Sequence, residues 1–177
     1  TIGCITTISA GMYGPAHITR TGSGSQSLQE EPVCFTVGEM NGDITDRVKF
    51  IADLFTPAGK TLVTDDLWGQ RWSKMVTNCM VNATAGMTGL MSHEVRADKE
   101  TRKQILHLGI ETIKVGRALG YNVKPPMGDF SLEEMEMGAS LEGNEELDRI
   151  LQGTPPDMPG RPSLAQDVIK GRKTEID

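Results

Sequence analysis

Residues 72–82 read Trp-Ser-Lys-Met-Val-Thr-Asn-Cys-Met-Val-Asn, and this stretch decides the fold of the second half of the chain. Its apolar residues, together with those of the preceding turn, recur at spacings of three, four and one, which predicts an amphipathic helix with a broad apolar stripe. Asp65 or Asp66 can cap the start of this helix, and we expect it to run to about Ala85.

Three polar residues interrupt the apolar character of this helix. Lys74, Asn78 and Asn82 stand at i, i+4 and i+8, so an α-helix stacks them along one ridge, about 6 Å apart. Burying a lysine and two carboxamides without partners costs on the order of several kcal/mol. In one interpretation the ridge is a solvated strip or bonds a neighbouring backbone. In the other it lines a cleft and holds a polar ligand, with the lysine as cation and proton donor.

The remaining residues from Asp65 onward also predict helices. One should run over about residues 94–119, followed by Gly120 as a left-handed C-cap. Ser131 and Glu134 form a capping box that opens another helix. A Pro- and Gly-rich loop over residues 152–162 precedes a short helix over about 163–170. The fold class is therefore mainly α.

The first 64 residues have strand and turn character instead. Short β-branched runs predict strands, and Asp43 can cap a helix over about residues 44–57. A strand, helix, strand order fits the end of an α/β sheet, so we expect one domain over residues 1–64 and a helical one over 65–177. A flexible turn is expected at residues 22–25. The predicted strands are Ile2–Ile8, His17–Thr21, Val33–Val37 and Lys60–Thr64.

Composition excludes several classes of function. The formal charge of −6 and the lack of a basic cluster argue against a nucleic-acid binder. No apolar run approaches the roughly 18 to 20 residues of a membrane span. The three cysteines and three histidines lack metal-ligand spacing, so we expect no metal site, reduced thiols and a cytoplasmic location. The long apolar helices could pair between subunits, which favours a homodimer.

The segment from Arg161 to Asp177 is the second informative stretch. Ser163 and Glu175 each stand at a predicted helix start, where backbone N–H groups favour anions. Plain capping explains Ser163, and a solvated first-turn acid explains Glu175, without any ligand. Thr174 to Asp177 has the form of a helix N-terminus and residue 1 is Thr, so we interpret the sequence as a piece of a longer protein.

Together the two stretches resemble the C-terminal half of the ketopantoate reductase (2-dehydropantoate 2-reductase) family. The resemblance covers nearly the whole chain. Its main motifs are Trp72-x-Lys74-x-x-x-Asn78-x-x-x-Asn82 and Pro162-Ser163-x-x-Gln166-Asp167-x-x-x-Gly171-Arg172-x-Thr174-Glu175-Ile176-Asp177. Gly38-Glu39-x-x-Gly42 and the stretch from Glu111 to Gly120 also resemble family positions.

The resemblance implies a Rossmann-type domain followed by a helical domain of the 6-phosphogluconate-dehydrogenase-like type. It implies that NADPH reduces the ketone of 2-dehydropantoate to pantoate, for coenzyme A synthesis. Lys74 would be the general acid, and Glu175 would bond the substrate and help orient the site. Asn78, Asn82 and Ser163 would bind the carboxylate and hydroxyl groups of the substrate. For Asp167 a structural role is favoured.

Two departures from the family pattern stand out. No GxGxxG follows an N-terminal strand, so the main NADPH site is missing from this chain and its cofactor-binding residues are unknown. We therefore expect the chain alone to bind NADPH weakly or not at all. The acidic, Met-rich stretch from Gly128 to Pro159 matches no family role, and a lid, a dimer surface and an insertion all stay open.

Two alternatives to this function remain. A reductase of the same architecture could act on another 2-keto or β-hydroxy acid, because a lysine and an asparagine serve any such carbonyl. The chain could also be a helical domain kept for oligomerisation or binding without catalysis, which the missing phosphate-binding turn favours.

Overall fold

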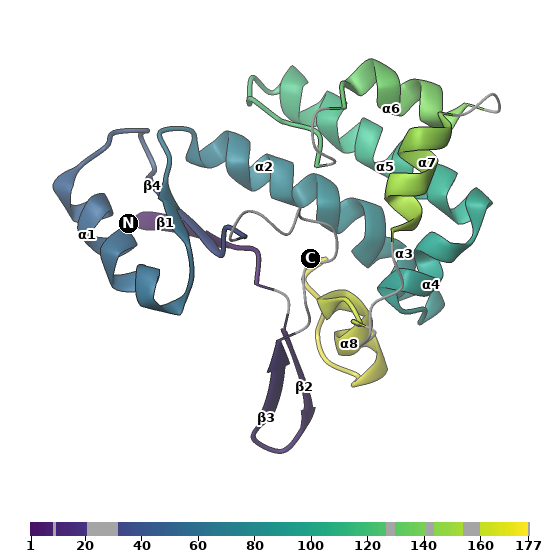
Figure 1. Ribbon diagram of the computed structural model, residues 1–177, viewed down its shortest axis with the longest axis horizontal. Coiled ribbons are helices and arrows are strands. Elements are labelled where there is room, and N and C mark those ends of the chain that lie inside the picture. The colour runs from purple at the N-terminus through teal and green to yellow at the C-terminus, as the bar shows by residue number, and fades with distance from the viewer. Residues whose placement is uncertain (9, 21–31, 127–129, 141–143, 154–159, 177) are drawn as a thin grey trace.

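A computed structural model describes residues 1–8, 10–20, 32–126, 130–140, 144–153 and 160–176. The structure is mainly α-helical, as the sequence predicts, and its described strands all lie before residue 64 (Figure 1). The sheet and α1 form one side of the molecule, the other helices form the opposite side, and α2 runs between the two (Figure 1). Within the described residues, no helix combines the length and apolar character that crossing a bilayer requires.

The central strand of the three-stranded sheet is β4 (Phe35–Glu39). It pairs antiparallel with β1 (Ile2–Thr6) and parallel with β5 (Thr61–Val63). The parallel pair is joined by α1 (Asp46–Phe55), which packs on β4 and β5. A short 3₁₀ turn (Thr56–Ala58) follows α1. The predicted strand, helix, strand order is therefore confirmed.

The predicted cap of α1 is wrong. Thr45, not Asp43, holds the cap position, and its hydroxyl accepts a hydrogen bond from the backbone N–H of Val48. The carboxylate of Asp43 instead accepts a bond from the Asn41 side chain at 2.7 Å. Both residue types are good caps, so the local sequence could not separate them.

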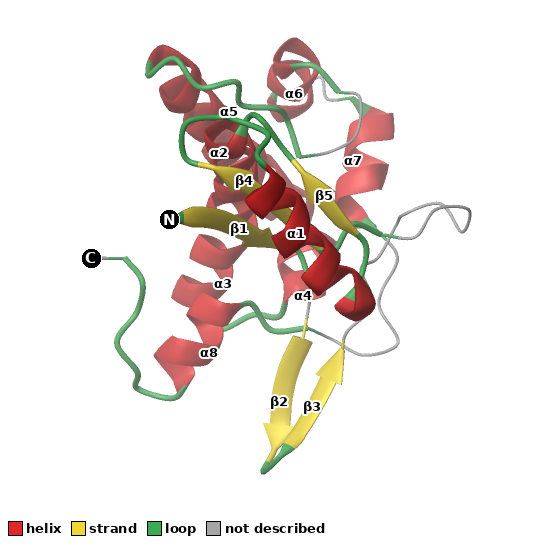
Figure 2. Ribbon diagram, turned by 90° about the vertical axis from the view of Figure 1, so that its left-hand side faces the viewer, coloured by secondary structure: helices red, strands yellow, loops and turns green. Residues whose placement is uncertain are grey.

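A two-stranded hairpin forms the second sheet. It consists of β2 (Ala10–Gly14) and β3 (His17–Arg20), and it projects away from the rest of the chain (Figure 2). The sequence predicted β3 but not β2, because Gly11 and Gly14 hide the alternation that marks a strand. The turn expected at residues 22–25 lies outside the described residues.

The helix that holds the polar ridge begins as predicted. Asp66 caps α2 (Leu67–Thr77) by accepting a bond from the N–H of Gly69 at 2.9 Å. The helix continues through a π-helical turn (Asn78–Asn82) into α3 (Ala83–Thr88). It therefore ends three residues later than predicted. The sequence did not predict the π-helical turn.

The start of α2 rests on the sheet. Leu67 is almost fully buried and lies over Gly3 and Gly38, which are paired across β1 and β4. A Cβ atom at Gly3 would come within 2.3 Å of the Leu67 side chain. Two adjacent glycines therefore let α2 approach the face of the sheet opposite α1.

The helix predicted over residues 94–119 is two helices. They are α4 (Ser92–Ala97) and α5 (Lys99–Ala118), and Asp98 between them caps α5 by accepting from the N–H of Thr101. The break was missed because several residues near Asp98 could equally cap a helix. Gly120 has φ 88°, which confirms the predicted C-terminal glycine.

Two further helices lie in the stretch from Gly128 to Pro159. The capping box of Ser131 and Glu134 opens α6 (Leu132–Ala139), as predicted, and Asn144 caps α7 (Glu145–Gln152). Both helices contribute to the helical core through Met135 and Leu147, which are fully buried. The described part of this stretch is therefore built into the domain. Of the loop expected at 152–162, residues 154–159 lie outside the described residues.

The last helix is α8 (Ser163–Ile169). Pro162 takes its cap position, so Ser163 is its first helical residue and the prediction of Ser163 as a cap is wrong. The side chain of Gln166 donates to the carbonyl of Arg161 at 2.8 Å. Gly171 follows with φ 62°, as the predicted helix end requires. Glu175 and Ile176 lie in a turn, and Asp177 lies outside the described residues.

The helical part has its own apolar core. Arg102 on α5 lies at the edge of this core and is almost fully buried. Its side chain connects α5 to α4 and α7. Its guanidinium donates to both carboxylate oxygens of Asp148 on α7, at 2.7 and 2.8 Å, and to the carbonyls of Arg96 and Ala97 on α4. The core comprises Val76, Met80, Val81, Ala85, Val95, Ile105, Leu106, Ile110, Ile113, Val123, Met135, Ala139, Leu147, Leu151 and Ala165.

Candidate functional site

The π-helical turn lies where the sequence predicts the functional residues. It begins at Asn78 and ends at Asn82. Such turns insert one extra residue per turn and are frequent at functional sites. The side-chain amide of Asn82 donates to the side-chain oxygen of Asn78 at 3.3 Å. The two asparagines are therefore neighbours, although the regular α-helical ridge that the spacing predicts is not present.

One pocket brings together four of the five predicted site residues. It has a volume of about 290 Å³ and lies between the π-helical turn, α3, α8 and the C-terminal turn. Asn78 and Asn82 come from the π-helical turn, Ser163 from the start of α8, and Glu175 from the C-terminal turn. The lining residues are Met75, Asn78, Cys79, Asn82, Ala83, Ser163, Leu164, Asp167, Glu175 and Ile176.

Lys74 is the predicted site residue that does not line this pocket. It lies one helical turn before Asn78, and its ammonium donates to the carbonyl of Thr6 at 2.6 Å. Thr6 is the last residue of β1, so Lys74 is held where the sheet meets α2. Partial burial raises the pKa of the Cys4 thiol, also on β1, and the charge of Lys74 offsets part of this rise.

The pocket offers both hydrogen-bond donors and carboxylate acceptors. Amide and hydroxyl groups come from the asparagines and Ser163, and carboxylates from Glu175 and Asp167. Asp167, for which the sequence favoured a structural role, stands four residues after Ser163 and so on the same face of α8. Met75, Leu164 and Ile176 add apolar surface. This arrangement suits a small molecule with several polar groups and a short carbon skeleton.

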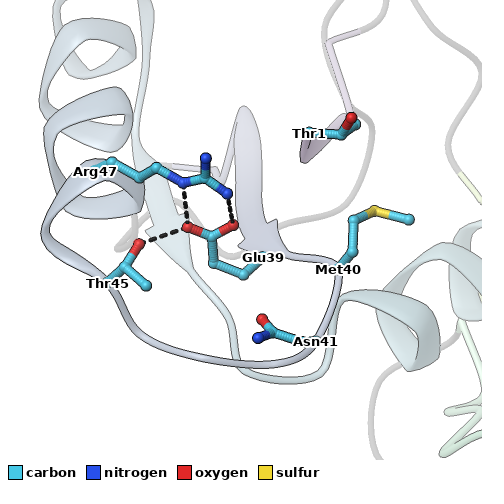
Figure 3. Close-up of a pocket in the computed structure, with 6 residues that line it drawn as sticks. All are labelled: Thr1, Glu39, Met40, Asn41, Thr45 and Arg47. Carbon is cyan, nitrogen blue, oxygen red and sulfur yellow. Dashed lines mark hydrogen bonds and ion pairs between the residues drawn. The ribbon is translucent and has the colours of Figure 1, made fainter.

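A second polar cluster lies at the junction of β4 and α1 (Figure 3). Glu39 is almost fully buried, and its carboxylate accepts bonds from Nε and Nη2 of Arg47 at 2.7 and 2.6 Å. The hydroxyl of Thr45 donates to the same carboxylate. These bonds, those from Arg47 foremost, lower the pKa of the Glu39 carboxyl to about 2. The adjoining pocket, of about 550 Å³, is also lined by Thr1, Met40 and Asn41.

The strand-to-helix turns do not suit a dinucleotide cofactor. A pyrophosphate binds at a helix N-terminus where a glycine-rich turn leaves the N–H groups free. The turn from β4 to α1 holds the ionised Glu39, and Thr45 already caps the helix. The turn from β5 to α2 holds Asp66, which accepts from the helix N-terminus. A carboxylate therefore lies at the start of α2 and another beside the capped start of α1, and both disfavour a phosphate there.

These elements define a helical domain that follows strands and a helix of a Rossmann-type α/β domain, as in a group of oxidoreductases. The family described as ketopantoate reductase PanE/ApbA C terminal matches residues 66–177, and the chain therefore belongs to the ketopantoate reductase family.

Solved structures support the same fold. The chain is similar to 2-dehydropantoate 2-reductase from Geobacter metallireducens GS-15, with 22% identity and a TM-score of 0.68, over 99% of this chain and 50% of that chain. 2-Dehydropantoate 2-reductase from Methylococcus capsulatus is 20% identical, with a TM-score of 0.65, and the match covers 98% of this chain and 47% of that chain. A PanE/ApbA family ketopantoate reductase from Ralstonia eutropha JMP134 is 22% identical, with a TM-score of 0.60, and the match covers 99% of this chain and 48% of that chain.

The chain thus spans about half the length of these structures. Identities this low show the fold and not the reaction. No curated protein matches the chain.

Proposed function

We propose that the protein to which this chain belongs reduces 2-dehydropantoate to pantoate with NADPH, in the synthesis of pantothenate and coenzyme A. The observation that carries the proposal is the pocket in which Asn78, Asn82, Ser163 and Glu175 meet. These residues come from two stretches of sequence about 80 residues apart, and both stretches line the same pocket. Membership of the ketopantoate reductase family supports the same reaction.

The polar groups of the pocket would bind the substrate. Asn78 and Ser163 offer donors to a carboxylate, and Glu175 offers an acceptor to a substrate hydroxyl. Asn82 already donates to Asn78, which fixes the orientation of both amides relative to each other. Asn78, Ser163 and Glu175 are exposed in the chain alone, so an analogue that lacks one of these partners loses affinity to the extent that the bound ligand shields them from water.

Lys74 would deliver the proton of the reaction. Reduction of a ketone turns its oxygen into an alkoxide, and a nearby ammonium stabilises that charge in the transition state. The alkoxide takes one proton from Lys74, which becomes a neutral amine. The bond to Thr6 uses one of the three ammonium hydrogens, which leaves two others for the carbonyl oxygen of a bound substrate. This role makes Lys74 the general acid.

The remaining features of the proposal concern the longer protein. We place the domain boundary at residues 64 and 65, and we assign NADPH binding to residues other than those of the two strand-to-helix turns described above. The protein is proposed to be a cytoplasmic homodimer that binds a small 2-keto acid and no nucleic acid. The net charge of −6 supports the last point.

The second candidate is reduction of another 2-keto or β-hydroxy acid. It is favoured by the pocket itself, because its two amides and a hydroxyl would bind the carboxylate of any keto acid without reference to its carbon side chain. A non-catalytic binding domain is the third, favoured by the two strand-to-helix turns that do not suit a dinucleotide. A panel of 2-keto acids separates the first two candidates.

The proposal is tested by NADPH oxidation with 2-dehydropantoate, using the longest chain that the gene encodes. We expect Lys74→Ala to lower kcat/KM by about two orders of magnitude or more. Lys49→Ala is the control, because within the described residues the Lys49 side chain makes only an exposed ion pair with Asp46 in α1. Retention of most of the activity by Lys74→Ala would show that the role assigned to Lys74 is wrong. Absence of NADPH binding would favour the non-catalytic domain.

A further inference from the structure

Gly86 on α3 lies directly behind Leu164 of α8. A Cβ atom added at Gly86 would come within 2.8 Å of both Cγ and Cδ2 of Leu164. Gly86 is inside a helix and does not have a positive φ, so its backbone conformation does not require glycine. What requires glycine at this position is the space that Leu164 occupies.

Leu164 connects this contact to the pocket. It lines the pocket together with its neighbours on α8, Ser163 and Asp167, whereas Gly86 does not reach the pocket. On the other side, Ala85 and Ala165 are buried in the helical core, which holds α3 and α8 close together. The side chain of Leu164 therefore lies between a closely packed helix and a cavity.

A methyl group at position 86 would move only part of this arrangement. The added Cβ would lie 3.7 Å from Cβ of Leu164, an ordinary contact, so the two backbones can stay where they are. Cγ and Cδ2 are too close, so the isobutyl group of Leu164 must turn to another rotamer. Leu164 lines the pocket, so a rotamer that moves the group away from position 86 can enter the pocket.

We propose that Gly86 determines how bulky a carbon side chain the pocket accepts, by leaving room for Leu164 to stay out of it. The inference rests on the proposed function, in which the ligand is a 2-keto acid branched next to its carbonyl. With Leu164 retracted, the wall formed by Met75, Leu164 and Ile176 leaves space for that branch. Gly86 is thus a positioning residue that acts through Leu164.

The first test measures the pocket without assuming any reaction. Cys79 lines the same pocket and is partly exposed, so its labelling rate reports access to the pocket. The background variant is Cys4→Ser, because the exposed Cys4 would also react. Gly86→Ala should slow labelling by a bulky fluorescein maleimide about ten-fold and labelling by iodoacetamide less than two-fold. Gly86→Ala/Leu164→Ala should restore the rate with the maleimide.

The second test measures specificity in the longest chain that the gene encodes. Gly86→Ala should raise KM for 2-dehydropantoate about ten-fold and leave KM for straight-chain 2-oxobutanoate unchanged. The kcat values for both should stay within about two-fold, because Gly86 touches no reacting group. A purely structural loss would lower the activity toward both acids alike.

Gly138→Ala is the matched control. A Cβ at Gly138 on α6 would lie 2.5 Å from Cδ2 of Leu147 on α7, a similar clash with a leucine that does not line the pocket. The proposal is overturned if Gly86→Ala changes neither the labelling nor KM, or if Gly138→Ala changes them as much. If the unaltered protein reduces neither acid, the proposed function fails and the labelling alone decides. If Gly86→Ala does not fold, Leu164→Ala alone must speed maleimide labelling, and an unchanged rate overturns the proposal.

Discussion

Two polar clusters of this chain differ in how far their groups are satisfied. At the junction of β4 and α1, the Glu39 carboxylate accepts three hydrogen bonds, from Arg47 and Thr45 (Figure 3). In the pocket beside the π-helical turn, Asn78 and Asn82 share one bond, and the Ser163 hydroxyl has no partner within the described residues. Buried polar groups are normally satisfied within the protein. Asn78 and Ser163 are exposed, so water satisfies them in the chain alone, and they stay available to a ligand.

This difference separates groups that stabilise the fold from groups that serve a function. The larger of the two pockets adjoins Glu39, yet its charged groups are already paired with each other. The smaller pocket has fewer internal bonds and more free donors and acceptors. Volume alone would favour the pocket beside Glu39 over the proposed one. Substitutions should separate the two kinds of group, since one kind should change stability and the other activity.

The largest expected effect on stability comes from Arg102, the most fully satisfied charged group. Arg102→Met should lower the free energy of unfolding by on the order of 3 kcal/mol, because Asp148 and two carbonyls lose their donor inside the protein. Urea denaturation of the chain measures it. Arg102→Met/Asp148→Leu should recover much of the loss.

Lys103→Met is the control for Arg102, since Lys103 pairs with Glu100 across one turn of α5, and the Glu100 side chain is largely exposed. Its cost should be less than about 1 kcal/mol. If Arg102→Met costs no more than Lys103→Met, hydrogen-bond satisfaction does not identify the stabilising groups, and the comparison fails.

A smaller effect distinguishes two serines at helix starts. Ser131 accepts a bond from the N–H of Glu134, so Ser131→Ala should cost about 1 kcal/mol of stability and leave activity unchanged. Ser163 makes no capping bond. Ser163→Ala should therefore leave the unfolding midpoint unchanged and raise KM for 2-dehydropantoate about ten-fold. Equal effects of both substitutions on stability would show that Ser163 is a helix cap after all.

The predictable parts of this fold depend on local chemistry. Asp66, the Ser131 and Glu134 box, and Gly120 were predicted because a cap depends on a few adjacent residues. The same reasoning chose Asp43 over Thr45 and missed Asp98, because several residues nearby satisfied the rule. The π-helical turn has no such local signal, since its extra residue is tolerated only where the surrounding packing allows it.

The candidate site was predictable to a similar extent. Asn78, Asn82, Ser163 and Glu175 were joined into one site through the resemblance to the ketopantoate reductase family, and the structure brings them to one pocket. The contact of Lys74 with Thr6 joins residues 68 positions apart. Its acceptor is a backbone carbonyl, which every residue type has, so the sequence could not predict this contact. Gly86 was missed for a related reason. Its importance depends on the side chain of Leu164 that packs against it, and the sequence around a helical glycine does not show which residue packs there.

The smallest expected effect concerns the pH dependence of the Glu39 cluster. The carboxyl has a pKa of about 2 in the folded chain, against an ordinary value of 4.5. A carboxyl with a lowered pKa stabilises the folded state above its ordinary pKa, and this contribution is lost as the pH falls toward the lowered value. At pH 7, Glu39→Gln should therefore unfold at a lower urea concentration than the unaltered chain. The difference in urea midpoint between Glu39→Gln and the unaltered chain should narrow steadily between pH 4.5 and pH 2.

The effect should be modest because Arg47 itself is mostly exposed, and solvent screens its charge. Asp43→Asn is the matched control, since Asp43 is exposed and pairs only with the neutral Asn41 side chain within the described residues. Its effect on the urea midpoint should not depend on pH in this range to the same degree. A constant gap for Glu39→Gln from pH 7 to pH 2 would mean that shape rather than charge makes Glu39 stabilising. The Glu39 cluster would then be a packing contact, and its ionised carboxylate could no longer be used to argue against a phosphate at the start of α1.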